Sequence, residues 1–126
     1  MPGQPINLLE PNNLANSHNV RMEDGLIVAE GDDPYMIFRP LRWVGAGCFA
    51  VDLDLEEIEG ALTPRLYVNA GRGLSQDASD AMRRTSPGHY RLYFSALGKV
   101  RSIRFDPSEV DCKFKLRQFE IRRVNP

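Results

Sequence analysis

Residues 100–124, close to the end of the chain, constrain the fold most strongly, because apolar and charged side chains alternate there. Ile103 and Phe105 alternate with polar neighbours until Asp106-Pro107, which favours a turn because proline cannot donate to a sheet ladder. One apolar face opposite one charged face is typical of an antiparallel sheet with a single side on a core. The stretch therefore predicts strands, beginning with 102–105.

The second half of this stretch repeats the pattern with a shift. Phe114 and Leu116 alternate with basic residues, and Phe119 and Ile121 resume the alternation one residue out of step. An extra residue in one strand of an antiparallel pair produces such a shift. We therefore predict a β-bulge at Arg117-Gln118.

Further apolar segments, bounded by glycine and proline turns, predict strands at 26–30, 35–39, 48–56, 65–70 and 89–95. Residues 57–63 are expected as a loop, and residues 75–84 as one or two helical turns or a loop. About seven to eight short strands without strand–helix alternation indicate an all-β fold, an antiparallel β-sandwich of jelly-roll type.

The chain of 126 residues suits one domain. Prolines and asparagines crowd the first 19 residues, so we expect residues 1–24 to be an extended lead-in and residues 25–126 to be the sandwich. Apolar side chains of the lead-in are expected to hold it to the domain edge: Leu8, Leu9 and Leu14.

Charge is divided unevenly along the chain. Residues 1–63 carry 11 acidic and 3 basic side chains, whereas residues 64–126 carry 6 acidic and 13 basic ones. This asymmetry fits either a basic binding surface or pairing of strands from the two halves, and we favour pairing. The acidic row Asp52, Asp54 and Glu56 is then expected near basic residues of the second half.

Cysteine usage and the N-terminus favour a cytoplasmic setting. Cys48 and Cys112 show no metal-ligand spacing and are expected to be free thiols. Residues 1–11 do not resemble a signal peptide, and no segment approaches the ~20 apolar residues of a membrane span.

Catalytic and metal-binding motifs are weak. His18 and His89 lie in the lead-in and beside a turn, where a solvated structural histidine is the favoured interpretation. The acidic turn with Asp32 and Asp33 leaves a structural calcium open, although acidic turns are usually just solvated. We therefore expect no enzyme activity, cofactor or catalytic metal.

Five polar or aromatic side chains point away from the predicted core: Tyr67, Asn69, Arg91, Tyr93 and Arg104. Tyrosine rings stack on sugar faces and the other groups bond hydroxyls, so they form a carbohydrate-binding face if their strands share a sheet. The alternative is an ordinary solvated sheet face with cross-strand packing. Trp43 is expected either as a loop-borne sugar platform or partly buried.

Basic residues gather late in the chain, which raises a nucleic-acid groove as a further alternative. The net charge of −1 argues against it, because nucleic-acid-binding domains are usually strongly basic. We expect no nucleic-acid partner.

A series of short motifs follows the same order as in a known family: Asp33-Pro34-Tyr35, Gly45-Ala46-Gly47-Cys48-Phe49, Pro64-Arg65-Leu66-Tyr67-Val68, Gly71-Arg72-Gly73-Leu74-Ser75, Ile103-Arg104-Phe105-Asp106-Pro107, Phe114-Lys115-Leu116 and Phe119-Glu120-Ile121-Arg122-Arg123. This order resembles the N-terminal β-sandwich module of bacterial glycosyltransferases and polysaccharide-assembly enzymes. The closing strands are also similar to galactose-binding-domain-like carbohydrate-binding modules.

The resemblance implies a non-catalytic carbohydrate-binding module that is accessory to a bacterial glycosyltransferase. Its partners would be a glycan or polysaccharide intermediate and a transferase domain in a longer chain. The alternative is a structural or protein-interaction β-sandwich with no sugar site.

Overall fold

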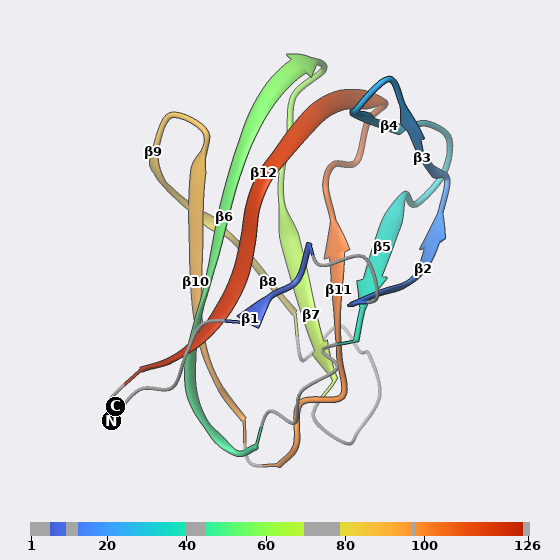
Figure 1. Cartoon of the computed structure of the whole chain (residues 1–126). Coiled ribbons are helices and arrows are strands. Elements are labelled where there is room, and N and C mark those ends of the chain that lie inside the picture. Colours follow the sequence, from blue (N-terminus) through green and yellow to red (C-terminus); the bar gives the residue numbers. More distant parts are fainter. Residues whose placement is uncertain (1–5, 10–12, 40–44, 70–78, 97, 125–126) are drawn as a thin grey trace.

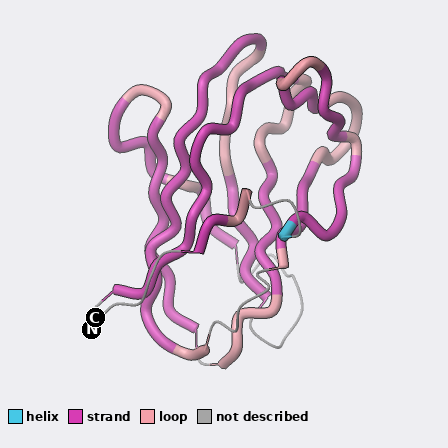
Figure 2. The backbone as a smooth tube through the Cα atoms, viewed as in Figure 1, coloured by secondary structure: helices cyan, strands magenta, loops and turns pink. Residues whose placement is uncertain are grey.

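The computed structural model describes residues 6–9, 13–39, 45–69, 79–96 and 98–124, and these segments form two antiparallel sheets packed face to face (Figure 1). Strands make up most of the described chain, and the one helical position in these segments is a 3₁₀ turn at Asn13, drawn cyan in Figure 2. The predicted all-β antiparallel sandwich is therefore confirmed.

The larger sheet has seven strands in the order β3-β4-β12-β6-β10-β9, and β1 also pairs with β12. Its strands are β1 (Ile6–Asn7), β3 (Val20–Glu23), β4 (Leu26–Ala29), β6 (Gly47–Glu59), β9 (Arg83–Ser86), β10 (His89–Ala96) and β12 (Cys112–Val124).

The smaller sheet has five strands in the order β2-β5-β11-β7-β8. Its strands are β2 (Leu14–His18), β5 (Tyr35–Phe38), β7 (Arg65–Asn69), β8 (Ser79–Ala81) and β11 (Ser102–Asp106). Consecutive strands β11 and β12 thus belong to different sheets, and the loop between them crosses from one layer to the other.

The predicted bulge in β12 is confirmed. Leu116 lies opposite Leu55 of β6, whereas Gln118 lies opposite Asp54, so Arg117 is the extra residue. This insertion lets Phe114 and Phe119 both point inward, although an uninterrupted alternation would place them on opposite faces.

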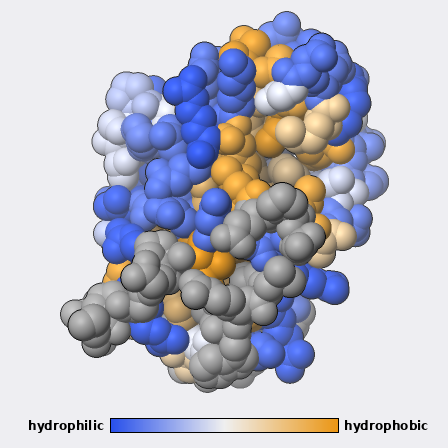
Figure 3. All heavy atoms as spheres, in the orientation of Figure 1, coloured by the Kyte–Doolittle hydropathy of each residue, from blue (hydrophilic) through white to orange (hydrophobic). Residues whose placement is uncertain are grey.

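The core is built from residues that alternate inward along both sheets, and in the space-filling view a hydrophobic band runs between hydrophilic flanks (Figure 3). Ten residues on the apolar side of the strand alternation are buried: Phe49, Val51, Leu53, Leu66, Leu92, Ile103, Phe105, Phe114, Phe119 and Ile121. Three others are partly buried and pack against these: Val68, Phe94 and Leu116.

The segment expected as an extended lead-in contributes strands to both sheets. β1 and β3 join the larger sheet, and β2 joins the smaller one. Leu8 is fully buried, and its backbone N–H donates to the carbonyl of Phe119 at 2.8 Å. Two local expectations are wrong. β6 continues to Glu59 where a loop was expected from Glu57, and β8 and the start of β9 are strands where residues 75–84 were expected as helical turns or a loop. Residues 75–78 lie outside the described segments.

The uneven charge distribution is explained by strand pairing, as predicted. β6 carries the acidic row and lies between β10 and β12, which carry basic residues. Asp52 forms ion pairs with Arg91 at 2.5 Å and with Arg122 at 3.1 Å, and Glu56 pairs with Arg117. Each such surface pair typically contributes up to about 1 kcal/mol.

Candidate functional site

The five residues predicted to form one sugar-binding face are divided between the two sheets. Tyr67 and Asn69 lie on β7 and Arg104 on β11, all in the five-stranded sheet, whereas Arg91 and Tyr93 lie on β10 in the seven-stranded sheet. The prediction of a single site that combines both tyrosines is therefore wrong.

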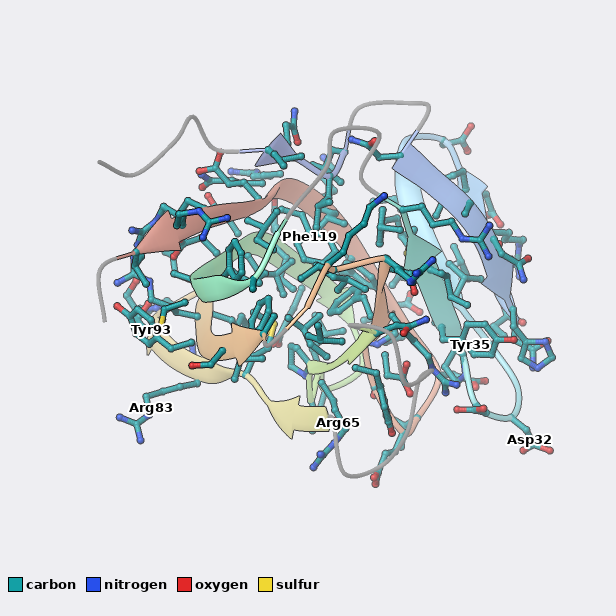
Figure 4. The ribbon with its side chains drawn as sticks, turned by 90° about the horizontal axis from the view of Figure 1, so that it is seen from below. Asp32, Tyr35, Arg65, Arg83, Tyr93 and Phe119 are labelled. Atoms are coloured by element: carbon teal, nitrogen blue, oxygen red, sulfur yellow. The ribbon has the colours of Figure 1, made fainter. Side chains whose placement is uncertain are left out.

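The physical reason is that alternation of apolar and polar residues shows which side chains point away from the core, but not which sheet a strand joins. Sheet membership depends on long-range pairing, here of β10 with β6 and of β11 with β7. Figure 4 shows Tyr93 and Tyr35, which belong to different sheets, on opposite sides of the core residue Phe119.

A row of aromatic and cationic side chains crosses four neighbouring strands of the five-stranded sheet. His18 of β2 stacks on Tyr35 of β5, with ring centroids 5.2 Å apart. The guanidinium carbon of Arg104, on β11, lies 4.1 Å from the Tyr35 ring centroid and 4.9 Å from that of Tyr67, on β7. We call these four residues the aromatic row.

Arg104 is fixed at the middle of the aromatic row by carboxylates. Its Nε and Nη2 donate to the two carboxylate oxygens of Asp106 at 2.7 and 3.0 Å, and Nη2 also donates to Asp33 at 2.8 Å. Hydrogen bonding to Asp106 raises the pKa of Arg104 above its ordinary value, although partial burial opposes this shift. A bidentate pair of this kind specifies orientation as well as charge.

The turn that carries Asp33 is itself held from two sides. The side-chain amide of Asn19 donates to the carbonyl of Asp32 at 2.6 Å, and the N–H of Gly31 donates to Asp111 at 3.0 Å. Gly31 has a φ of +89° and Asp33 one of +50°, a conformation that glycine and aspartate tolerate better than other residues. The Asp33 carboxylate is therefore presented to Arg104 by a constrained turn.

A hollow of about 390 Å³ lies beside the aromatic row. We call it the Tyr67 hollow; it is lined by Asp33, Pro34, Thr63, Arg65, Tyr67, Asp106, Ser108 and Glu109. Three carboxylates and the Arg65 guanidinium line the hollow, and Arg104 pairs with two of the carboxylates. One negative charge remains in excess, so an anionic ligand is disfavoured there. The polar groups suit a ligand rich in hydroxyls.

Sequence reasoning missed Tyr35 and His18 as members of this surface. All four residues of β5 are apolar or aromatic, so alternation alone does not say which pair faces outward. In the structure Met36 and Phe38 are buried, and the Tyr35 side chain lies on the outer face of the sheet. The direct opposition of Tyr67 and Arg104 also depends on the register of β7 and β11.

The remaining candidate residues from the sequence do not belong to the aromatic row. Asn69 lies opposite Ser102, and its carbonyl accepts a hydrogen bond from the N–H of Arg101 at 2.8 Å. Both cysteines are free thiols, as predicted. Trp43 and Gly71-Arg72-Gly73 lie outside the described residues.

The described segments also bear on metal binding and on membrane insertion. Within them, no group of three or more histidine, cysteine, aspartate or glutamate side chains is arranged to hold a metal ion. The same part of the chain contains no helix that is long and apolar enough to span a membrane.

Comparison with solved structures identifies similar sandwiches. A low-affinity xylan-binding module, CBM86, from the gut symbiont Roseburia intestinalis superposes with a TM-score of 0.58 at 10% identity, over 97% of this chain and 93% of that one. A mutant of CBM29-2, a family 29 carbohydrate-binding module, gives a TM-score of 0.56 at 12% identity, over 99% and 88%.

The chain shares its fold with carbohydrate-binding modules. At these identities the likeness establishes the fold alone. No protein-family model and no curated protein sequence matches the chain.

Proposed function

We propose that this protein is a non-catalytic carbohydrate-binding domain whose ligand occupies the Tyr67 hollow, beside the aromatic row. The observation that carries the proposal is the rigid arrangement of Tyr35, Arg104 and Tyr67 across three adjacent strands, next to a polar hollow. Its occurrence on the fold of known carbohydrate-binding modules supports the same function.

The chemistry of the hollow favours an uncharged sugar. Tyrosine rings supply broad contact surfaces at low entropic cost, because each ring fixes only two χ angles. Arg65, Asp33 and Glu109 line the same hollow and offer donors and acceptors for sugar hydroxyls. The negative charge that remains in excess repels uronate, sulfate and phosphate groups, so neutral sugars are the expected ligands.

The affinity is expected to be low. The hollow is open to solvent, and ordering a flexible glycan costs conformational entropy. Xylo-oligosaccharides are the rational first ligand, because one structurally similar module is described as binding xylan with low affinity.

The test is calorimetric titration with xylo-oligosaccharides and other neutral oligosaccharides. Tyr67→Ala should weaken binding by about tenfold or more, because its ring lines the hollow and stacked aromatic anchors carry a large share of such interfaces. Tyr35→Ala should weaken binding less, because His18 and Arg104 cover the Tyr35 ring and it contributes by holding Arg104 in place. Tyr93→Ala is the matched control: it removes an exposed tyrosine from the opposite sheet and should leave binding unchanged.

An interaction module without a sugar site is the competing function. It gains support if no neutral glycan binds, or if Tyr35→Ala and Tyr67→Ala bind as well as the parent protein. Capture of a protein partner that is lost in the same two variants would then assign the aromatic row to protein recognition.

The sequence resemblance suggests a finer role. We propose that the domain acts in the cytoplasm of a bacterium beside a glycosyltransferase catalytic domain and holds a polysaccharide intermediate. Transferase activity that needs this domain for long acceptors, but not for short ones, would support this role.

A further inference from the structure

The outer face of the seven-stranded sheet carries a second hollow, of about 380 Å³, where β9, β10, β6 and β12 run side by side. We call it the Arg122 hollow. Its lining includes Asp52, Thr85, Ser86, Arg91, Gln118 and Arg122. None of these residues belongs to the aromatic row or to the Tyr67 hollow.

One carboxylate orients two guanidinium groups in the Arg122 hollow. Arg91 donates from Nε to Oδ1 of Asp52 at 2.5 Å, and Arg122 donates from Nε to Oδ2 at 3.1 Å. Within the described residues, the terminal amino groups of Arg122 have no acceptor, and a third of its side chain is exposed. A guanidinium oriented in this way can still offer its terminal N–H groups to a ligand.

A third arginine lies on the same face of the sheet, outside the lining of the hollow. Arg83 of β9 lies directly opposite Arg91 of β10, so both side chains project from the same face of the sheet. Like charges directly opposite on neighbouring strands are destabilising. No ion pair involves Arg83 in the described part of the chain, and its side chain extends away from the ribbon (Figure 4).

Asp52 is the one carboxylate that lines the Arg122 hollow in the described part of the chain. Asp52 is shared by the two arginines, and Glu120, opposite Asp52 on β12, accepts a hydrogen bond from the amide of Gln118. His89 Nδ1 lies 3.8 Å from Asp54. Two arginines therefore meet one carboxylate in the lining of the Arg122 hollow, whereas three carboxylates and one arginine line the Tyr67 hollow.

We propose that the Arg122 hollow is a second binding site, which takes the carboxylate of an acidic oligosaccharide such as a uronic acid unit. Planar guanidinium groups match carboxylates in geometry and charge. Thr85, Ser86 and Gln118 supply hydroxyl and amide groups for the hydroxyls of the same sugar. A bound carboxylate also offsets the repulsion between Arg83 and Arg91.

The test is titration of the whole chain with tri-galacturonate, with a neutral oligosaccharide of the same length, and with inorganic phosphate. Tri-galacturonate should bind, and Arg122→Gln and Arg91→Gln should each weaken it by about tenfold or more, because charge-assisted hydrogen bonds are lost. Arg117→Gln is the matched control, since it removes the same charge from β12 outside the hollow and should change affinity by less than about twofold.

Arg83→Gln separates recognition from folding. It should weaken tri-galacturonate binding without lowering the melting temperature, because it removes an unfavourable charge pair. Equal losses in Arg117→Gln and Arg122→Gln would overturn the site, as would phosphate binding as tight as tri-galacturonate. Absence of binding would overturn it too. Tyr67→Ala should leave tri-galacturonate binding intact, so the two hollows are tested separately.

Discussion

The guanidinium of Arg104 lies over the ring of Tyr35, with 4.1 Å between its central carbon and the ring centroid. Only a fifth of the Arg104 side chain is exposed, so water screens this cation–π contact less than at an open surface. Asp106 and Asp33 fix the guanidinium between the two tyrosines, with Tyr35 on the neighbouring strand β5 and Tyr67 on the neighbouring strand β7. The aromatic row is therefore rigid before any ligand arrives, which lowers the entropic cost of binding.

Arg104→Lys should destabilise the fold by about 1–3 kcal/mol although it keeps the charge, because lysine cannot make the bidentate bond to Asp106. Urea unfolding measures the loss. Arg117→Lys is the control, because its pair with Glu56 is largely exposed and should be worth less than about 1 kcal/mol. Equal effects of the two substitutions would contradict the structural importance of Arg104.

Phe105→Ala should cost about 3–5 kcal/mol, because it opens a cavity in the core. Phe105 is fully buried, and its ring contacts Phe114 and Phe119 at centroid distances of 6.3 and 5.5 Å. Tyr93→Ala, on an exposed position of β10, should stay within about 0.5 kcal/mol of the parent. Thermal or urea unfolding of the two variants distinguishes core from surface, and a small loss in Phe105→Ala would refute the packing.

The in-or-out pattern of the strands was predictable from the sequence, because alternation at Phe105 or Leu53 depends only on neighbouring residues. The bulge at Arg117 was predictable for the same reason. The division of Tyr67 and Tyr93 between two sheets was not, because strands β7 and β10 are placed by partners that are distant in sequence. Sequence alone therefore identified outward residues, but it could not group them into sites.

Gly60→Ala and Gly25→Ala should differ in stability even though both glycines have a φ of +79°. At either position, a residue with a side chain loses about 1–2 kcal/mol of stability, because it must adopt the left-handed backbone conformation. At Gly60 the new Cβ would also lie 2.4 Å from the carbonyl oxygen of Asp111, whereas nothing lies within 4 Å at Gly25. Unfolding should show Gly60→Ala to be the less stable by at least about 1 kcal/mol, and equal losses would contradict the close approach.

The free energy of unfolding should decrease at alkaline pH as the buried Cys112 thiol ionises. Burial, with smaller effects from Asp111 and Glu57, raises the pKa of this thiol from 9.0 to about 11. A pKa that is higher in the folded state favours the neutral thiol there, so its contribution is intact below pH 9 and is lost as pH rises toward about 11. Urea unfolding across this range measures the decline.

Cys112→Ala serves as the control for the alkaline decline, because it removes the titrating group and should flatten this part of the pH profile. The buried Cys112 should also react with thiol reagents more slowly than the half-buried Cys48. A parent protein and a Cys112→Ala variant with the same alkaline slope would show that other groups cause the decline.

The most direct test of the central claim is an NMR titration of the parent protein with neutral oligosaccharides, beginning with xylo-oligosaccharides, followed through backbone amide shifts. Binding at the Tyr67 hollow should move the amides of Tyr35, Arg104 and Tyr67 on β5, β11 and β7, and should leave those of β10 in place. Shifts confined to β10, or none with any neutral glycan, would contradict the account.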